Sequence, residues 1–430
     1  MRLTASPHHI TVETLKAAFY SLKRGAAAGV DGVRRTDCER GLDGRLADLW
    51  EQVRRGACRA VPVRRVLIPK PDGGRRPPGI AALEDRIVQR ALVDVVPNPI
   101  CEEVFPGFSY GFRPGRGAHD ALDTLACVIE RCKVGWIVDC DMRKRFDEIS
   151  RDWLLRFLEH HIEDGRVLRL SGKWLPAGVM QDGLWNDTGT GSPQGAILSP
   201  ILANIYLHSV PDLWLDRKWH KRAARGEVRI IRYADDYVIA TQCRDDAERF
   251  LQDAQAGFEQ CGLRLHPEKT RLIEFGQFAA ANRRKRGQGR PETFDFLGIT
   301  HCCRETRKGR FGLGRLPIGK RMRQTLQASR EALRRRMHRD VYETGGWLGQ
   351  VLRGWLNCYA VPTGCRSLRT FACQVNRIWM RILRRRSQMD RFGLERLERI
   401  CERLRPQLRS VHPWPTERFT VATGGRSRMR

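Results

Sequence analysis

One stretch decides how this chain folds: residues 228–239, Val-Arg-Ile-Ile-Arg-Tyr-Ala-Asp-Asp-Tyr-Val-Ile. Two β-branched runs joined by a tight acidic step predict a strand–turn–strand hairpin. Its apolar flanks would lie in a core, and its tip would present the carboxylates of Asp235 and Asp236 at one spot. Adjacent Asp residues also occur in ordinary turns, because Asp readily accepts hydrogen bonds from its own backbone. The hairpin alone therefore leaves two interpretations open, an ordinary turn and an acidic site.

Composition and charge limit the kinds of molecule that this protein is expected to bind. The 430 residues are enough for two or three domains, and 41% hydrophobic with 30% charged residues is typical of a globular protein. The formal net charge of +29 opposes compaction unless a polyanion neutralises it, which indicates nucleic acid or an anionic membrane. No run approaches the ~18–20 apolar residues that span a bilayer, and the N-terminus lacks the apolar segment of a signal peptide. We therefore expect nucleic acid, and no membrane, as the partner.

The cysteines indicate a reducing compartment. There are 14 of them, and no two have the Cys-x-x-Cys spacing of a zinc site. We expect free thiols that behave as small buried hydrophobes, in a cytoplasmic protein. The lack of Cys/His clusters also argues against an appended zinc or His-Asn-His nuclease domain.

A second apolar run, residues 135–142, also ends in acid. Its sequence, Gly-Trp-Ile-Val-Asp-Cys-Asp-Met, predicts a buried strand that carries Asp139 and Asp141 on one face. A carboxylate there is costly unless it is paired or bound to metal, and the spacing does not say which of the two binds metal. Carboxylates from two strands can converge on Mg²⁺, or on Mn²⁺ in its place. Two such ions roughly 4 Å apart clamp the attacking and leaving oxygens of an in-line phosphoryl transfer.

Three further segments suit contacts with phosphates and bases, although each has an ordinary explanation. A predicted strand over 62–70 runs into the turn 71–77. This turn, with Lys70, forms a basic finger whose three cations could bind a triphosphate or could face solvent. The loop 109–117 alternates aromatic residues with Arg and Gly, which suits base stacking by the rings and phosphate contact by Arg113. Residues 192–196 bring Gln194, a donor and acceptor, next to a glycine, or simply begin a helix.

The last third of the chain changes character. Three stretches with helical spacing of apolar residues, within about 321–337, 348–359 and 368–386, predict a three-helix bundle with a basic flank. Its aromatic stripe fits a core better than a stacking platform, whereas the arginines are too uniformly of one sign for a merely solvated face. We expect an exposed Gly/Arg/Lys-rich loop over 279–291. From His412 onward the chain is basic and lacks periodicity, so we expect an irregular tail.

The order of these motifs resembles the reverse transcriptases encoded by bacterial group II introns. The motifs are Ile-Pro-Lys-Pro-Asp-Gly-Gly, Tyr-Gly-Phe-Arg-Pro-Gly-Arg, Asp-Met-x-x-x-Phe-Asp, Ser-Pro-Gln-Gly, Tyr-Ala-Asp-Asp, His-Pro-Glu-Lys-Thr and Phe-Leu-Gly. Leu-Arg-Gly-Trp-Leu-Asn at 352–357 resembles the thumb, or maturase, segment, and the resemblance runs from about Gly29 to the C-terminus. Ala234 within Tyr-Ala-Asp-Asp favours this lineage over the retroviral one.

The resemblance implies an α+β fold with the right-hand architecture of polymerases. An N-terminal extension and fingers would occupy 1–105, and a palm with an antiparallel sheet would occupy 106–305. A helical thumb (maturase domain) would follow over 306–405, and a basic tail over 406–430.

The resemblance also assigns roles to single residues. Asp141, Asp235 and Asp236 become the catalytic acids and metal ligands, with the Met142 carbonyl as an extra ligand, while Asp139 becomes structural. The expected nucleotide-binding residues are Lys70, Arg76, Arg113, Phe146, Gln194 and Lys269. Lys70 and Arg76 would contact the triphosphate, and Phe146 would exclude a ribose 2′-hydroxyl. Gln194 would lie near the nascent base pair, and Lys269 on the palm. Independently of the resemblance, the aromatic loop and the basic flank of the helices predict RNA-binding residues Tyr110, Phe112, Arg334, Arg335 and Arg336.

The implied function is RNA-directed DNA synthesis by a protein that also binds its own intron RNA and assists splicing and mobility. Its partners would be an RNA template, intron RNA, a DNA primer or target, and deoxynucleoside triphosphates. Lys144-Arg145 departs from the family, which often has Gly followed by a small or aromatic residue there; the two cations could add phosphate grip or crowd the pocket. Two alternatives stay open: a free-standing cellular reverse transcriptase in defence or repair, and an RNA-binding splicing cofactor without polymerase activity.

Overall fold

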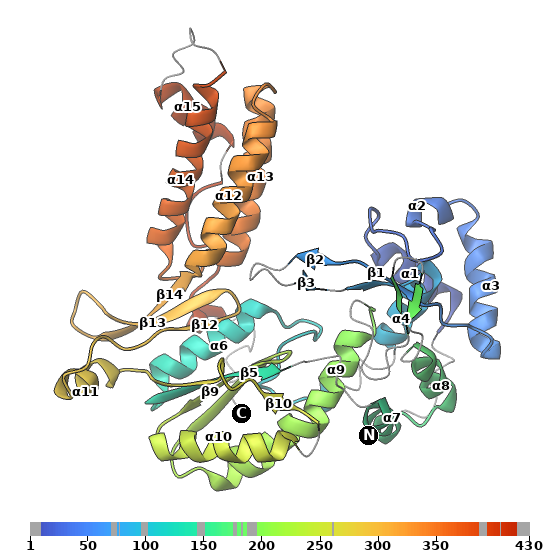
Figure 1. The fold of residues 1–430 in the computed structure, drawn as a ribbon, viewed down its shortest axis with the longest axis horizontal. Coiled ribbons are helices and arrows are strands. Elements are labelled where there is room, and N and C mark those ends of the chain that lie inside the picture. The colour runs from blue at the N-terminus through green and yellow to red at the C-terminus, as the bar shows by residue number, and fades with distance from the viewer. Residues whose placement is uncertain are drawn as a thin grey trace. The chain divides into compact units, whose positions relative to one another are not determined.

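The structure is a computed structural model. It describes residues 10–69, 75–76, 78–95, 102–143, 151–174, 179–181, 184–186, 196–259, 262–386, 394–404 and 406–418 (Figure 1). Helices are mixed with mainly antiparallel sheets, as expected for an α+β chain. Within the described residues, no helix has the length and apolar character needed to cross a bilayer.

The chain divides into two compact units, each assembled from segments that are distant in sequence. The first unit comprises Met1–Ala118, Cys140–Tyr237 and Glu248–Thr270. The second unit comprises His119–Asp139, Val238–Ala247 and Arg271–Arg430.

The first unit begins with helices that bury one apolar face. Thr11 caps the first helix through a reciprocal pair of hydrogen bonds with Thr14, a capping box. Leu15 and Phe19 of that helix are fully buried against the neighbouring helices. The helices are α1 (Val12–Ser21), α2 (Arg35–Cys38), α3 (Leu42–Arg55) and α4 (Leu83–Val95).

Short strands and a second group of helices complete this part of the first unit. One sheet has the order β4-β1-β6-β7, in which only β1 and β6 are parallel. Its strands are β1 (Val63–Arg65), β4 (Gly79–Ile80), β6 (Val179–Gln181) and β7 (Leu184–Asn186). The basic finger forms as the antiparallel pair β2 (Ile68–Pro69) and β3 (Arg75–Arg76), whose turn lies outside the described residues. The helical elements are α7 (Arg151–His161), α8 (Gly165–Trp174), α9 (Ser199–Leu207) and the π-helices η2 (His208–Asp212) and η3 (Leu215–Ala223).

The central sheet contains the hairpin expected over 228–239. Its order is β10-β5-β9-β8, and β11 also pairs with β5. The strands are β5 (Trp136–Arg143), β8 (Val228–Tyr233), β9 (Asp236–Thr241), β10 (Arg264–Leu265) and β11 (Arg271–Glu274), and the accompanying helices are α6 (Ala118–Arg131) and α10 (Arg244–Glu259). Ile231 and Val238, one on each arm of the hairpin, are fully buried. The apolar flanks therefore anchor the hairpin in a core, as the pattern predicts.

The segment after the central sheet differs from the expected loop. Residues 279–285 form a helix, α11 (Ala279–Lys285), because three alanines followed by Arg and Lys are strong helix formers. The prediction of an irregular loop over 279–291 is wrong for these seven residues. An antiparallel sheet follows, with β12 (Phe294–Phe296), β13 (Ile299–Glu305) and β14 (Phe311–Pro317).

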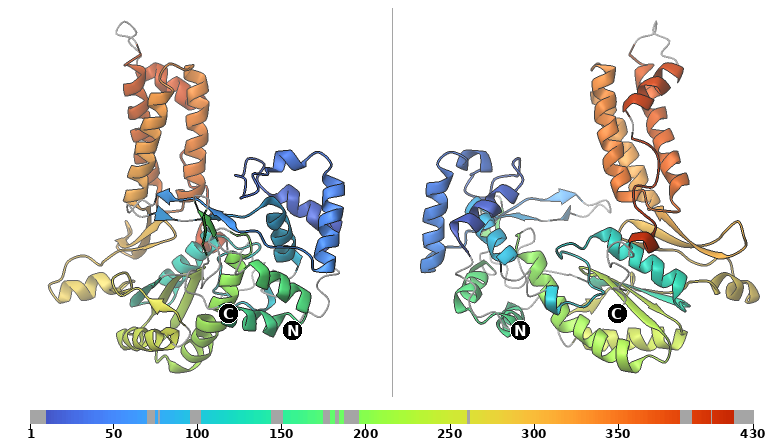
Figure 2. Two further views of the ribbon diagram at one scale, coloured as in Figure 1. Left: turned by 45° about the vertical axis from the view of Figure 1, so that its right-hand side comes forward. Right: turned by 180° about the vertical axis from the view of Figure 1, so that it is seen from behind.

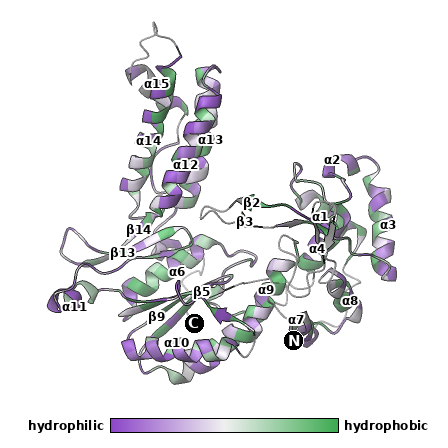
Figure 3. Ribbon diagram, in the orientation of Figure 1, coloured by the Kyte–Doolittle hydropathy of each residue, from purple (hydrophilic) through white to green (hydrophobic). Residues whose placement is uncertain are grey.

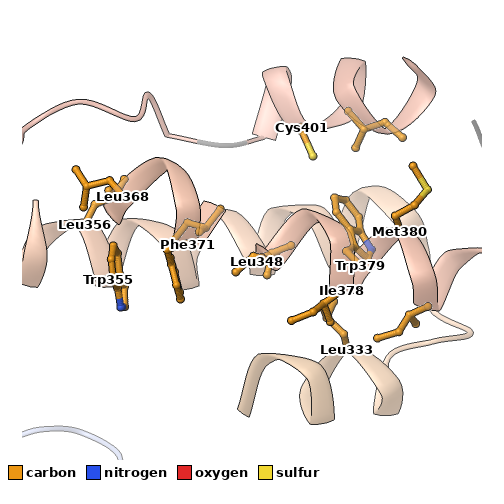
Figure 4. Close-up of a cluster of buried hydrophobic side chains, with 14 of the residues drawn as sticks. Leu333, Leu348, Trp355, Leu356, Leu368, Phe371, Ile378, Trp379, Met380 and Cys401 are labelled. Atoms are coloured by element: carbon orange, nitrogen blue, oxygen red, sulfur yellow. The ribbon is translucent and has the colours of Figure 1, made fainter. Parts of the chain in front are cut away.

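The helical domain of the second unit has one helix more than expected. Its helices are α12 (Gly319–Arg335), α13 (Val341–Tyr359), α14 (Cys365–Leu383) and α15 (Leu394–Leu404). The core contains Trp355 stacked on Phe371 with ring centroids 4.0 Å apart, and Ile400 and Cys401 of α15 are buried in the same cluster (Figure 4). Hydrophilic residues recur along α12 and α14 between the apolar ones, as Figure 3 shows. The aromatic stripe is therefore core, as predicted, and α15 corrects the three-helix count.

The C-terminal segment is anchored in the second unit by a buried ion cluster. Asp123 of α6 is 1% exposed and accepts from Arg315 Nη1 at 2.6 Å and from Arg418 Nε at 2.5 Å. Beside it, the rings of His119 and His412 stack with centroids 3.6 Å apart. The expectation that the chain from His412 onward is merely a basic tail is corrected for residues 412–418, since Arg418 neutralises a buried carboxylate.

Asp123→Ala should destabilise the protein strongly. The substitution leaves Arg315, which is 2% exposed, without its carboxylate, and breaking a buried ion pair in this way costs about 3–5 kcal/mol. Glu343→Ala is the matched control, because Glu343 pairs with Arg339 where both side chains are 59% exposed, and such pairs contribute at most about 1 kcal/mol. Urea denaturation of both variants measures the two losses. Equal losses would contradict the structural role assigned to the buried cluster.

Candidate active site

The fold brings the three predicted catalytic acids to one end of the central sheet. The Gly135 amide donates to the Thr241 carbonyl at 2.9 Å, so the start of β5 lies beside the end of β9. The two strands are therefore antiparallel, and Asp141 near the end of β5 lies beside the start of β9. That start is Asp236, and Asp235 occupies the preceding turn. Strand pairing alone thus gathers carboxylates from sequence motifs that are far apart.

The turn that carries Asp235 has an uncommon backbone. Ala234 has φ of 56°, in the left-handed region that non-glycine residues rarely adopt, and it is buried. A residue in this region costs about 1–3 kcal/mol and persists only where its surroundings hold it. Gly111 is part of those surroundings, because a Cβ atom at this position would lie 2.3 Å from the Ala234 nitrogen. Only glycine allows this close approach of the two backbones.

A buried arginine holds the same turn from within. Arg232 is fully buried, and its guanidinium donates to Asp212 Oδ2 at 2.6 Å, to Asn204 Oδ1 at 2.9 Å and to the Ala234 carbonyl at 2.9 Å. The Tyr237 hydroxyl donates to the other oxygen of Asp212 at 3.1 Å. Burial, reinforced by the Asp212 charge, raises the pKa of Tyr237 well above its ordinary value, so the hydroxyl stays protonated and donates.

The loop 108–111 completes this support. Its backbone runs beside β8, where the Tyr110 amide donates to the Arg232 carbonyl and the Arg232 amide donates to the Phe108 carbonyl, both at 2.9 Å. The Asn204 side-chain amide donates to the Gly111 carbonyl at 2.6 Å. Asn204 therefore links the loop to Arg232, and the loop serves as scaffold for the acidic turn.

This scaffold role changes the interpretation of the aromatic loop. Tyr110 is 5% exposed and Arg113 is 4% exposed, which leaves neither side chain facing an external base or phosphate in this structure. The Arg113 guanidinium instead pairs with Glu102 at 2.8 Å and donates to the Ser109 carbonyl at 3.0 Å. Phe112 differs, since its ring is 51% exposed.

Basic partners distinguish Asp141 from Asp139. Lys269, in the connection between β10 and β11, places Nζ 3.2 Å from Asp141 Oδ2 and is 59% exposed. Asp139 pairs with Arg271 at 3.3 Å, directly across the β5–β11 ladder. Both cations are exposed, but Asp139 has a partner directly across the strand ladder, as expected of a structural carboxylate, whereas the partner of Asp141 comes from a connection between strands.

The donor atoms of this site fit a hard divalent ion. Within the described residues, no three His, Cys, Asp or Glu side chains form a preassembled metal site. Mg²⁺ needs none, because it is usually held by one or two carboxylates with waters and substrate phosphates in its remaining positions. The Asp141 carbonyl accepts from the His266 amide of the connection after β10 at 2.8 Å. Carbonyls alternate in direction along a strand, so the Met142 carbonyl points away from β10 and is available on the side of β9.

The structure does not bring every predicted site residue to the acidic turn, and some of these residues are outside the described part of the chain. Lys70, Phe146 and Gln194 are outside the described residues, as are Lys144-Arg145, and Arg76 lies in β3 with its side chain outside the description. Arg334 and Arg335 are exposed at the end of α12, whereas the Arg336 guanidinium lies 4.3 Å from the ring centroid of Trp347.

Sequence reasoning missed the residues that support the turn: Arg232, Asp212, Asn204 and Gly111. One signal was present, since Arg232 shares a strand face with Ile230 and a charge on a buried face requires a partner. The partner itself, Asp212, lies in a helical segment whose position no local pattern reveals.

Gly111→Ala should lower the free energy of unfolding by about 1–3 kcal/mol, the usual cost of forcing an extra carbon into a packed site. Gly44→Ala is the matched control in α3, where nothing lies within 4 Å of the added carbon. It should stabilise by about 0.5–1 kcal/mol, because Ala is the better helix former. Urea denaturation measures both changes, and wild-type stability of the Gly111 variant would contradict the close contact with Ala234.

Comparison with known proteins agrees with this geometry. The profile of the family described as reverse transcriptase (RNA-dependent DNA polymerase) matches residues 68–301, more than half of the chain, and this region contains all three acids. Protein YkfC of Escherichia coli strain K12 is 33% identical over 284 residues, which cover 59% of this chain and 74% of that protein.

Two further relatives are proteins of introns. Group II intron-encoded protein LtrA of Lactococcus lactis subsp. cremoris is 32% identical over 202 residues, 47% of this chain and 33% of that protein. An uncharacterized 91 kDa protein in the cob intron of Schizosaccharomyces pombe is 40% identical over 151 residues, 35% of this chain and 18% of that protein. The chain thus spans a third or less of the length of these two relatives. The resemblance read from the motifs is confirmed, and the chain belongs to the reverse transcriptase (RNA-dependent DNA polymerase) family.

Proposed function

We propose that this chain is the RNA-directed DNA polymerase of a group II intron, which adds deoxynucleotides to a primer 3′-hydroxyl and also binds intron RNA to assist splicing and mobility. The observation that carries the proposal is the position of Asp141 beside Asp235 and Asp236 within the reverse transcriptase region. The relatives from introns support the assignment to an intron protein.

Asp141, Asp235 and Asp236, with the Met142 carbonyl, would hold the divalent ions, Mg²⁺ or Mn²⁺. When bound, two such ions stabilise the charge on the attacking and leaving oxygens of phosphoryl transfer. The contribution of the chain is to keep these carboxylates in place. The Arg232 guanidinium, through its bond to the Ala234 carbonyl, holds the turn so that the acids need little rearrangement before the reaction.

Cations would meet the triphosphate. The Lys269 ammonium is exposed and lies beside Asp141. It can therefore approach phosphate oxygens that a divalent ion would hold at this carboxylate. On the resemblance to the family, Lys70 and Arg76 also contact the triphosphate, Phe146 excludes ribonucleotides and Gln194 faces the nascent base pair. Arg113 is left out of this set because its guanidinium is committed to Glu102.

The right-hand arrangement is part of the proposal. Fingers over 1–105 are supported by the basic β2–β3 pair, and a palm over 106–305 is supported by the sheet that carries the acids. A thumb over 306–405 is supported by helices α12 to α15. Deoxynucleoside triphosphates, an RNA template and a DNA primer or target would be the substrates.

Intron RNA would bind the basic flank of the thumb. Along α12 the exposed cations are Lys320, Arg321, Arg323, Arg330, Arg334 and Arg335. Cations on one side of a helix match the regularly spaced phosphates of RNA, to which they contribute sequence-independent, salt-sensitive affinity.

One observation keeps a second function open. Lys144-Arg145 stands where the family often has Gly followed by a small or aromatic residue, so a splicing cofactor without polymerase activity is the competing proposal. A polymerase assay separates the two directly. A free-standing enzyme of defence or repair differs instead in its genomic surroundings, which would lack intron RNA domains.

Asp235→Asn should abolish primer extension on an RNA template with Mg²⁺ and deoxynucleotides. The rate should fall more than about 100-fold, because even residues that only support metal ligands cost 10–100-fold when changed. Asp48→Asn, an exposed carboxylate of α3, removes the same charge and should leave the rate unchanged. Wild-type extension by the Asp235 variant would sink the metal assignment, and no extension by the unmodified protein would favour the splicing cofactor.

Neutralising Arg334, Arg335 and Arg336 together to Gln should weaken binding to intron RNA. Each lost phosphate contact should reduce the slope of log K against log salt by about 0.7–0.9. The control triple replaces Arg40, Arg59 and Arg166, exposed residues of the first unit, and removes the same net charge. Filter binding at several salt concentrations measures the slopes, and an unchanged slope would exclude the end of α12 as a phosphate-contact surface.

A further inference from the structure

Beyond the thumb, a second group of cations lies on the second unit. Residues 278–310 contain nine Arg or Lys against three Asp or Glu, a local net charge of +6 in 33 residues. The cations lie in α11, in the segment that follows it up to Arg290, and in the hairpin tip (residues 304–310), the name we give to the end of β13 with its connection to β14. None of these segments contains a catalytic motif, so the polymerase reaction does not account for this charge.

Most of these cations form no ion pair among the residues that the structure describes. Arg283 pairs with Glu292 at 3.6 Å, and Arg286 pairs with Glu274. The other seven cations are exposed and, among the residues that the structure describes, have no ion-pair partner. One is Arg304 near the end of β13, and the six outside the strands are Arg284, Lys285, Arg290, Arg307, Lys308 and Arg310. Seven like charges raise the energy of the free protein, and a polyanion would relieve it.

The fold brings α11 and the hairpin tip together on a rigid base. Cys303 of β13 contacts the Gly276 carbonyl just before α11, with its Sγ at 3.8 Å. In Figures 1 and 2, α11 and the β13–β14 hairpin extend to the same side, and helices α12 to α14 extend in a different direction. Beneath them, Phe275 packs on Phe294, and Phe294 stacks on the buried His301 with centroids 4.9 Å apart. Burial, helped by the charge of Arg315, lowers the pKa of His301 to about 3, so this ring is neutral and packs as an aromatic.

An exposed aromatic residue accompanies the cations. Phe278 directly precedes α11 and is 61% exposed, an unusual position for a phenylalanine. Aromatic rings among cations suit RNA, in which unpaired bases of loops and bulges stack on protein side chains while phosphates meet Arg and Lys. Duplex DNA lacks such unstacked bases.

We propose that α11, Phe278 and the hairpin tip form a second RNA-binding surface, which holds a folded RNA by its phosphates and by one unpaired base. The inference rests on the proposed function, since it supplies a separate anchor for the intron RNA of this polymerase. The catalytic acids belong to the first unit, and the surface belongs to the second. RNA binding here is therefore separable from nucleotide addition.

The test variant replaces with Gln the six unpaired cations outside the strands and leaves Arg304 of β13 unchanged. Its ligand is a hairpin RNA with an unpaired loop and a stem of about 16 base pairs, the length that one double-stranded RNA-binding domain spans. Affinity should fall by at least about tenfold, and the salt slope should fall by about 0.7–0.9 for each lost phosphate contact. The rate of primer extension on a saturating short RNA–DNA primer-template should not change.

Three matched variants control this measurement. A control sextuple neutralises exposed cations of the first unit, Lys23, Arg40, Arg59, Arg166, Arg169 and Arg217, and should retain more affinity at equal net charge. Changing the four arginines of the test sextuple to Lys keeps the charge and should keep binding, which separates charge from misfolding. Phe278→Ala should cost about tenfold in affinity without changing the salt slope, because stacking releases no counterions.

Unchanged affinity and slope in the test sextuple would overturn the inference. So would an equal loss in the control sextuple, which would indicate an effect of net charge alone. An equal loss with a DNA duplex of the same length, or loss of binding to vesicles of anionic lipid with RNA binding intact, would reject RNA as the partner. An inactive wild-type polymerase that still loses hairpin binding in the test variant would count against the proposed function and not against this surface.

Discussion

A buried ion pair between Arg232 and Asp212 is the interaction on which the acidic turn depends. Neither side chain has exposed surface, and taking two charges out of water costs several kcal/mol for each. Good geometry and additional hydrogen bonds offset that cost, and here Asn204, Tyr237 and the Ala234 carbonyl supply them. Breaking the pair would leave a buried charge uncompensated, so the network tolerates one arrangement of the turn.

The same network explains why distant parts of the chain meet at the site. Asn204 of α9 and Asp212 of η2 accept hydrogen bonds from the Arg232 guanidinium, and Gly111, from the loop before α6, lies against the Ala234 backbone. The left-handed conformation of Ala234 is held by these contacts. A glycine without Cβ on one side and a guanidinium on the other leave the turn little freedom, and preorganised carboxylates are what metal-assisted phosphoryl transfer requires.

The basic side chains behind the net charge of +29 have two different environments, buried ion pairs and the protein surface. Arg113, Arg232 and Arg315 are buried and neutralise Glu102, Asp212 and Asp123, so they contribute to the fold and not to a nucleic-acid surface. The exposed cations include those of α12, of α11 and of the hairpin tip. A motif that reads as basic and aromatic, such as the loop 109–117, can therefore be scaffold, while a stretch expected to be a simple loop carries an exposed basic helix.

The sequence by itself determined the β8–β9 hairpin, the strand that ends near Asp141 and most of the long helices, because period-2 and helical apolar patterns are local properties. It also determined the family, through the order of short motifs. It did not reveal α11, whose alanines carry no amphipathic pattern. The helix α15 was missed although Leu394, Leu397, Ile400, Cys401 and Leu404 have helical spacing. The partners of Arg232 and Arg315 and the close contact of Gly111 with Ala234 were decided only by the tertiary structure. An ion pair or a backbone contact between residues 20 to 192 positions apart depends on packing that no local pattern encodes.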